Sequence, residues 1–219
     1  MSNVTVSCRD ATELNILVRI MLELALADIR KQGVNPLVTE TYRPLDRQHY
    51  LYCQGRTIAE CTTKGIGSVF AKAYSNPKAG KVTWTLDSIH IQRKAVDVIP
   101  QRLVKGKMTA IYNTKDPQTQ IIIKTMQKYG FEPGANWTTT PDSPHFQVKG
   151  DFSAVFDSKH TTTYVTKAIQ SALGIKADGL WGNGTIAAVN AFRSSRKYSD
   201  VTSGSLGSTA LKALLGKLA

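Results

Sequence analysis

Apolar side chains recur at helical spacing in three stretches of the first two thirds of the chain. The first covers residues 10–32 and starts with a capping-box-like Asp10. The other two cover residues 44–55 and residues 116–130, where an Asp-Pro pair marks the start of the third. Each pattern predicts an amphipathic helix with one buried face.

Short runs of β-branched or alternating residues predict strands at residues 37–41, 83–91, 95–99 and 145–148. The segment from Thr62 to Lys81 lacks periodicity and is rich in Gly, Lys, Ser and Asn, so we expect a long surface loop. Helices and short strands in this irregular order predict an α+β domain with a small, mostly antiparallel sheet over residues 1–150.

The pattern changes after residue 150. Three short helical patterns follow, near residues 164–173, 185–196 and 208–218, and Gly, Asp and Ser turns separate them. They predict a small all-α domain of three helices over residues 162–219, joined to the first domain by a linker at residues 151–161.

With 42% hydrophobic residues, the 219-residue chain has the composition of a globular protein. Its most apolar stretch, residues 16–29, contains three charged side chains, so we expect no transmembrane segment. The first ten residues carry neither a basic nor an apolar signal region, which predicts synthesis in the cytoplasm. Three cysteines without C-x-x-C spacing predict buried thiols.

A formal net charge of +12 favours polyanionic surroundings such as nucleic acid, anionic lipid or bacterial wall polymer. The basic residues are spread along the chain without a dense basic arm, which argues against nucleic acid. A nucleic-acid-binding protein would show a steep salt dependence of DNA affinity and no action on purified wall.

Two of the four histidines have a carboxylate at a suggestive spacing. His90 stands seven residues before Asp97, across a predicted turn, and Asp142 stands three residues before His145. Two imidazoles and one carboxylate, with a fourth position open to water, form the ligand set of a catalytic zinc. A further carboxylate is then needed as general base, and Asp142 is the candidate. The alternative is that these residues only form hydrogen bonds or cap turns.

The motif Ser-x-His-x6-Asp is followed about 45 residues later by Asp-x-x-His, and Tyr-Arg precedes a Gln-x3-Tyr helix. This set resembles the VanY-type D-alanyl-D-alanine carboxypeptidase and L-alanyl-D-glutamate endopeptidase family over most of residues 35–148. The resemblance implies a zinc peptidase domain with one Zn2+ per chain. The ligands would be His90, Asp97 and His145, and Asp142 would be the catalytic base.

The resemblance also implies roles around the ligands. Arg43 matches the arginine that stabilises a developing oxyanion, with a turn-bracing arginine as the alternative. Gln48 and Ser88 match positions that line the substrate cleft, and Trp137 is assigned to the same cleft. The chain departs from the family at Gln147, where the family often has glutamate.

Residues 162–219 resemble the three-helix peptidoglycan-binding module of many wall hydrolases. An Asp-Gly turn at Asp178 and an aromatic anchor at Trp181 carry the likeness. The resemblance implies that both residues bind the wall, and the alternative is a plain helical bundle with Trp181 in its core. Beside the peptidase motifs, this pairing resembles a modular phage endolysin.

The sequence therefore predicts a monomeric zinc hydrolase of bacterial peptidoglycan. L-alanyl-D-glutamate endopeptidase activity is favoured, and D-alanyl-D-alanine carboxypeptidase activity is the alternative. Such an endolysin would be made in the host cytoplasm and act at the cell wall, with a membrane-permeabilising lysis partner and no nucleic-acid partner. Two further hypotheses are a thiol peptidase that uses Cys53 and a non-catalytic wall-binding protein.

Overall fold

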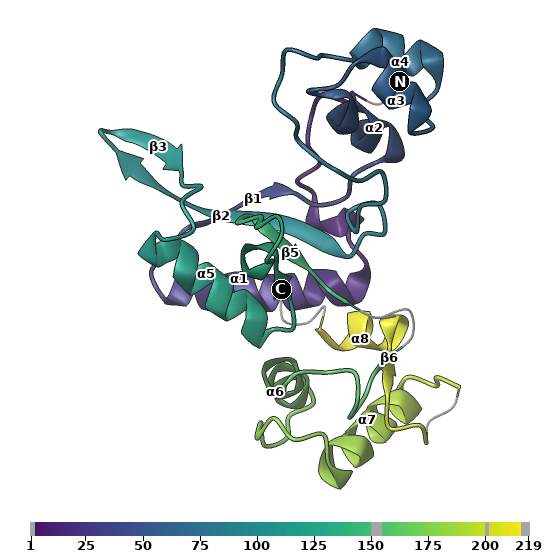
Figure 1. Cartoon of the computed structure of the whole chain (residues 1–219). Helices are drawn as coiled ribbons and strands as arrows, with labels where there is room; N and C mark the ends of the chain where they lie inside the picture. The colour runs from purple at the N-terminus through teal and green to yellow at the C-terminus, as the bar shows by residue number, and fades with distance from the viewer. Residues whose placement is uncertain (1–2, 150–154, 200–201, 216–219) are drawn as a thin grey trace.

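The structure, a computed structural model, describes residues 3–149, 155–199 and 202–215. Its centre is an antiparallel sheet with strand order β1-β2-β5-β4, and β3 pairs with the far end of β2 (Figure 1). The antiparallel sheet and its surrounding helices confirm the predicted α+β class. The strands are β1 Pro36–Glu40, β2 Ala95–Val104, β3 Lys107–Ala110, β4 Glu132–Pro133 and β5 His145–Gln147.

Strand β2 runs past the predicted end at residue 99 and forms a hairpin with β3, which the sequence analysis missed. The hairpin turns at Lys105 and Gly106, both of which have positive φ angles of 49° and 78°. Two-residue turns of this kind favour Asn-Gly or Asp-Gly, and Lys-Gly gives a weaker signal.

Two long helices, α1 Ile16–Lys31 and α5 Pro117–Lys128, cover one face of the sheet (Figure 1). Helix α1 begins later than predicted. Asp10 caps only a short 3-10 helix, η1 Ala11–Glu13, because its carboxylate accepts a hydrogen bond from the Thr12 backbone N–H. Asn15 then caps α1 through the Leu17 N–H. Leu17, Met21 and other apolar side chains of α1 are buried as predicted.

The long loop predicted for residues 62–81 is wrong. Helix α2 Leu45–Cys53 is followed by two short helices, α3 Ile58–Thr63 and α4 Ser68–Tyr74. A capping box between Thr57 and Glu60 starts α3. Helices of six and seven residues are too short to show a 3.6-residue period, and a small separate core formed by Cys61 and its neighbours stabilises them.

The strand predicted for residues 83–91 is also wrong, because these residues form bends and turns. Here side chains form hydrogen bonds with backbone groups that would pair with a neighbouring strand in a sheet. Thr85 Oγ1 accepts from the Asp87 N–H and donates to the Asp87 carbonyl, while Gln48 Nε2 donates to the Thr85 carbonyl. The alternating threonines therefore build a turn.

The three C-terminal helices are confirmed as α6 Thr163–Ala172, α7 Asn183–Ser195 and α8 Ser208–Leu215, and residues 216–219 lie outside the described part. Two-residue strands, β6 Val155–Phe156 and β7 Leu206–Gly207, pair with each other and were not predicted. Helices α6 and α8 pack on α1 and share its hydrophobic core. The domain boundary at residues 151–161 stays a prediction.

None of the helices in the described ranges is both long and apolar enough to span a membrane.

Candidate metal centre

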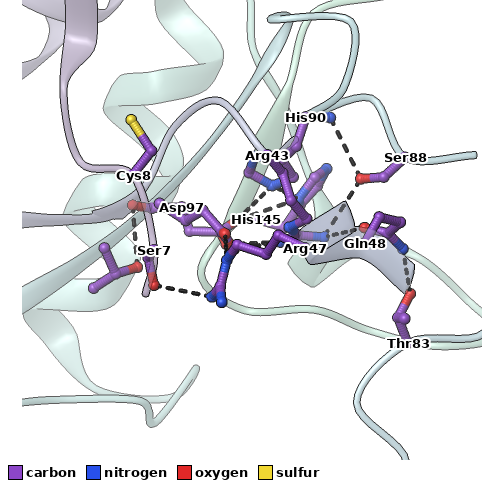
Figure 2. Close-up of polar contacts among 12 residues, drawn as sticks. Ser7, Cys8, Arg43, Arg47, Gln48, Thr83, Ser88, His90, Asp97 and His145 are labelled. Atoms are coloured by element: carbon purple, nitrogen blue, oxygen red, sulfur yellow. Dashed lines mark hydrogen bonds and ion pairs between the residues drawn. The ribbon is translucent and has the colours of Figure 1, made fainter. Parts of the chain in front are cut away.

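Three of the predicted site residues, His90, Asp97 and His145, lie together although they are distant along the chain (Figure 2). The sheet register places two of them, because Asp97 on β2 pairs directly with His145 on β5. His90 comes from the turn before β2. His90 Nε2 lies 3.2 Å from both Asp97 Oδ1 and His145 Nδ1, and His145 Nδ1 lies 3.3 Å from Asp97 Oδ1.

The buried His90 ring is held by the backbone. Its Nδ1 lies 2.6 Å from the carbonyl oxygen of Thr41, which directly follows β1. Because a carbonyl oxygen only accepts hydrogen bonds, Nδ1 carries the proton. The lone pair of Nε2 therefore faces Asp97 and His145, as a metal ligand requires.

Gln147 orients the His145 ring. His145 Nε2 lies 3.2 Å from Gln147 Oε1, and Gln147 Nε2 donates to Glu132 Oε2 at 3.2 Å. The Glu132 carboxylate thus turns the amide oxygen toward His145, so His145 Nε2 carries the proton and Nδ1 keeps its lone pair. A glutamate at position 147 would face Glu132 with like charge.

The three inward-facing atoms fit a divalent cation. Zinc bonds of about 2.0–2.2 Å in a tetrahedron separate neighbouring ligand atoms by about 3.3–3.6 Å, close to the spacing found here. Two lone pairs and a carboxylate at such distances repel one another unless a cation or a proton lies between them. Burial raises the pKa of Asp97, yet hydrogen bonds from His145 and His90, whose added protons take the place of the cation when no metal is bound, hold this pKa well below its ordinary value.

Arg43 approaches the same centre from the end of β1. Its Nη2 lies 3.8 Å from Asp97 Oδ2, and its Nη1 donates to Gln48 Oε1 at 2.9 Å. The buried Nε has no hydrogen-bond partner within the described residues. Arg43 also borders the cavity at this centre, so its fixed guanidinium can face a substrate oxygen, as the oxyanion role of Arg43 requires.

Glu40 holds Arg43 in place, and the sequence analysis missed it. Its two carboxylate oxygens each accept at 2.5 Å, one from Arg43 Nη2 and one from Arg47 Nε. A bulge between Val38 and Glu40 places Glu40 opposite Asp97 in the sheet. Glu40 is only 6% exposed, so this is a buried ionic network. The available signal was a glutamate at a strand end, three and seven residues before two arginines.

Gln48 and Ser88, predicted to line the cleft, both contact Arg43. Ser88 Oγ lies 3.5 Å from Arg43 Nη1 and borders the cavity, while the fully buried Gln48 also donates to the Thr85 carbonyl at 2.7 Å. Gln48 therefore braces Arg43 from the protein side. Contact of either residue with substrate stays a prediction.

Asp142 and Trp137 border a cavity of about 350 Å³ together with Arg43 and the three clustered residues. Desolvation by the surrounding cavity walls, followed by the charge of Asp97, raises the pKa of Asp142 above its ordinary value, which suits a group that exchanges protons. Gly134 supports this loop, because its carbonyl accepts from the Asp142 N–H and a Cβ there would stand 2.7 Å from the Asp142 carbonyl oxygen. The role of Asp142 as base stays a prediction.

Asp178 and Trp181 are distant in sequence from this centre and take structural positions in the segment between helices α6 and α7. The exposed Asp178 accepts from the Leu180 N–H and from Gln170 Nε2. The half-buried Trp181 packs against the core and donates to the Gly204 carbonyl at 3.0 Å. Wall binding by these two residues stays a prediction.

Residues 81–148 match a protein-family model described as D-alanyl-D-alanine carboxypeptidase. The matched segment is less than half of the chain. It contains His90, Asp97, Asp142 and His145, so the resemblance inferred from these residues is confirmed over the segment. No curated protein matches the chain.

The chain is also similar to solved structures. The L-Ala D-Glu endopeptidase ChiX of Serratia marcescens is 21% identical, and the match covers 65% of this chain and 88% of that chain at a TM-score of 0.40. The vancomycin-resistance D,D-pentapeptidase VanY in complex with Zn(II) is 21% identical, covering 63% and 73% at a TM-score of 0.37. VanYB in complex with D-alanine-D-alanine is 23% identical, covering 63% and 72% at a TM-score of 0.37.

Proposed function

We propose that this chain is a zinc-dependent peptidase that hydrolyses an amide bond of the peptidoglycan stem peptide. The observation that carries the proposal is the convergence of His90 Nε2, His145 Nδ1 and Asp97 Oδ1, each turned inward by the bonds around it. The family match of residues 81–148 supports the peptidase chemistry.

The residues present fit zinc better than a harder cation. Two imidazole nitrogens and one carboxylate are typical of zinc, whereas calcium and magnesium prefer sets made of oxygen ligands. When bound, zinc would polarise the scissile carbonyl and lower the pKa of a water. His90, Asp97 and His145 would hold it.

The chain's own residues would then move the protons and stabilise charge. Asp142 accepts a proton from the attacking water and returns a proton to the amine nitrogen as the amide bond breaks. The guanidinium of Arg43, fixed by Glu40, stabilises negative charge on the carbonyl oxygen. Both groups border one cavity, so a single bound peptide reaches both.

L-alanyl-D-glutamate endopeptidase activity is our proposal for the bond cleaved. A groove of about 810 Å³ adjoins the catalytic cavity and shares residues with it, so a substrate can extend beyond the cleaved bond. D-alanyl-D-alanine carboxypeptidase activity is the second candidate, and the description of the matching family favours it.

The remaining parts of the proposal concern biology. We propose that residues 162–219 dock the enzyme on the wall, and that the chain acts as a monomeric endolysin. It would be made in the host cytoplasm and reach the wall with a membrane-permeabilising lysis partner. A net charge of +12 supports attraction to anionic envelope polymers, which salt would weaken.

The deciding experiment incubates the purified full chain with peptidoglycan and identifies released fragments by mass spectrometry. New amino termini at D-glutamate indicate the endopeptidase, and free D-alanine indicates the carboxypeptidase. Chelation should stop release, and added Zn2+ should restore it. Intact peptidoglycan after incubation with the zinc-loaded chain would contradict the proposal.

A further inference from the structure

A second hollow, the threonine–tryptophan groove, lies beside the catalytic cavity. It has a volume of about 810 Å³ and is formed by two loops, residues 82–85 and residues 136–142. Trp137 is the only one of its neutral lining residues to which the sequence analysis gave a role.

The groove is continuous with the catalytic cavity. Val82, Thr83, Thr85, Trp137 and Asp142 border both hollows. Trp137 lines both hollows. Its ring centroid lies 5.0 Å from that of His145, and its Nε1–H donates to Glu132 Oε1 at 3.3 Å. A ligand in the groove would therefore lie next to a peptide bound at the metal centre.

The chemistry of the groove differs from that of the catalytic cavity. Apart from Asp142, its lining side chains are neutral, and they include two tryptophans and five threonines. Trp84 is 63% exposed, which is a large apolar surface to leave in water. The catalytic cavity instead contains charged side chains of both signs, Arg43 and Arg47 beside Glu40, Asp97 and Asp142.

A pyranose ring matches such a surface, because its C–H face is apolar while hydroxyl and acetamido groups project from its rim. Tryptophan rings offer broad flat faces for stacking, and threonine hydroxyls both donate and accept hydrogen bonds. A neutral ligand also avoids the cost of burying charge.

We propose that the threonine–tryptophan groove binds the N-acetylated sugars of the peptidoglycan strand to which the stem peptide is attached. This inference rests on the proposed function and extends it from the peptide to the glycan. Trp84 supplies the main stacking face, and Trp137 connects the sugar site to the catalytic cavity.

The test measures binding of tetra-N-acetylchitotetraose to the full chain by calorimetry. Trp84→Ala should weaken the affinity about tenfold, while Trp84→Phe, which keeps an aromatic face, should weaken it less. Leu103→Ala is the matched control, because Leu103 is 68% exposed on the β2–β3 hairpin and should leave the affinity unchanged. Thermal melting of each variant verifies the fold.

Indole NMR signals locate the sugar. Shifts of the Trp84 and Trp137 signals on adding the sugar support the inference. Absence of binding, or binding that Trp181→Ala removes and Trp84→Ala leaves intact, overturns it. So does a Trp84 shift produced by a sugar-free stem peptide and not by the sugar.

Cleavage of a sugar-free stem peptide by the unmodified chain is measured in parallel. A chain that cleaves the peptide but does not bind the sugar overturns this inference alone. A chain that binds the sugar but cleaves neither peptide nor wall overturns the proposed function and leaves the sugar site supported.

Discussion

The two halves of the metal centre are held by different means. Asp97 and His145 face each other across the β2–β5 ladder, so backbone pairing fixes their distance. His90 and Asp142 come from loops, and a few specific hydrogen bonds hold them, among them those to the Thr41 and Gly134 carbonyls. A metal ligand whose position is fixed by strand pairing tolerates changes in nearby side chains, whereas a residue on a loop depends on a few specific contacts.

Exposure separates the three ligands from the proposed base. His90, Asp97 and His145 are shielded, while the Asp142 side chain is exposed at the edge of the cavity. A metal ligand benefits from rigid burial, but a group that exchanges protons with substrate must be reached by it. Metal binding and proton transfer should therefore be separable by substitution.

The largest effect is expected for the sheet-borne ligand. His145→Ala should lose both bound zinc and peptidoglycan hydrolysis, because one of three ligands disappears. Elemental analysis of the purified variant and fragment release from wall measure the two losses. His160→Ala changes an exposed histidine paired with Asp157 and should keep both properties. Full zinc content in His145→Ala would contradict the proposed ligand set.

Asp142→Ala should keep zinc and lower the hydrolysis rate about 10²–10⁴-fold, since the proton acceptor is removed and the ligands remain. Asp87→Ala, in the neighbouring exposed loop, is the control and should retain both zinc and rate. Zinc content, turnover and wall sedimentation are measured on the same samples. Hydrolysis lost while wall binding persists also rejects the non-catalytic wall-binding hypothesis, and unchanged turnover would exclude Asp142 as the base.

The sequence predicted the residues of this site whose side chains are typical metal ligands or proton acceptors. Histidines and aspartates at fixed spacing indicated the metal cluster, and the structure brings them together. Glu40 was not predicted, because a bulge and the sheet register place it opposite Asp97. Gln147 stands only two residues after His145, but its role depends on the pairing of β5 with Glu132 on β4. A bulge that shifts β1 by one residue leaves no clear mark in a five-residue strand.

Dependence on contacts beyond the local sequence also explains the errors in the predicted secondary structure. Long periodic segments such as α1 and α5 bury a continuous face, so their patterns predicted them. Helices α3 and α4 are too short for a period, and residues 83–91 form turns through threonine side chains. In these segments tertiary packing and local side-chain bonds decide the structure.

Glu40→Gln should lower kcat about a hundredfold with little change in zinc content, because Arg43 loses the carboxylate that orients it. The buried Arg43 and Arg47 also lose their counter-charge, so the melting temperature should fall. Glu13→Gln is the control, since its pair with Arg93 is 43% exposed on each side and contributes about 0–1 kcal/mol. A changed KM with kcat intact would indicate substrate binding in place of positioning.

Gln147→Ala should weaken zinc affinity about tenfold, because His145 loses the acceptor that fixes its tautomer. Gln147→Glu alone places like charge against Glu132, and adding Glu132→Gln should restore the affinity by exchanging the two roles. Competition with a chromophoric chelator measures zinc affinity in all three variants. Equal affinities throughout would show that backbone pairing alone fixes His145.

The smallest expected effect concerns Cys53 and tests the thiol-peptidase hypothesis. Burial, followed by the neighbouring Cys61, raises the pKa of the Cys53 thiol to about 12. A raised pKa keeps the thiol protonated until the pH nears that value, so at pH 8 only about one molecule in ten thousand carries a thiolate. Iodoacetamide at pH 8 should therefore leave hydrolysis unchanged. Cys8→Ser removes the half-buried competing thiol, and mass spectrometry then reports whether Cys53 reacts. Activity that falls in proportion to Cys53 alkylation would favour a thiol nucleophile over the metal centre.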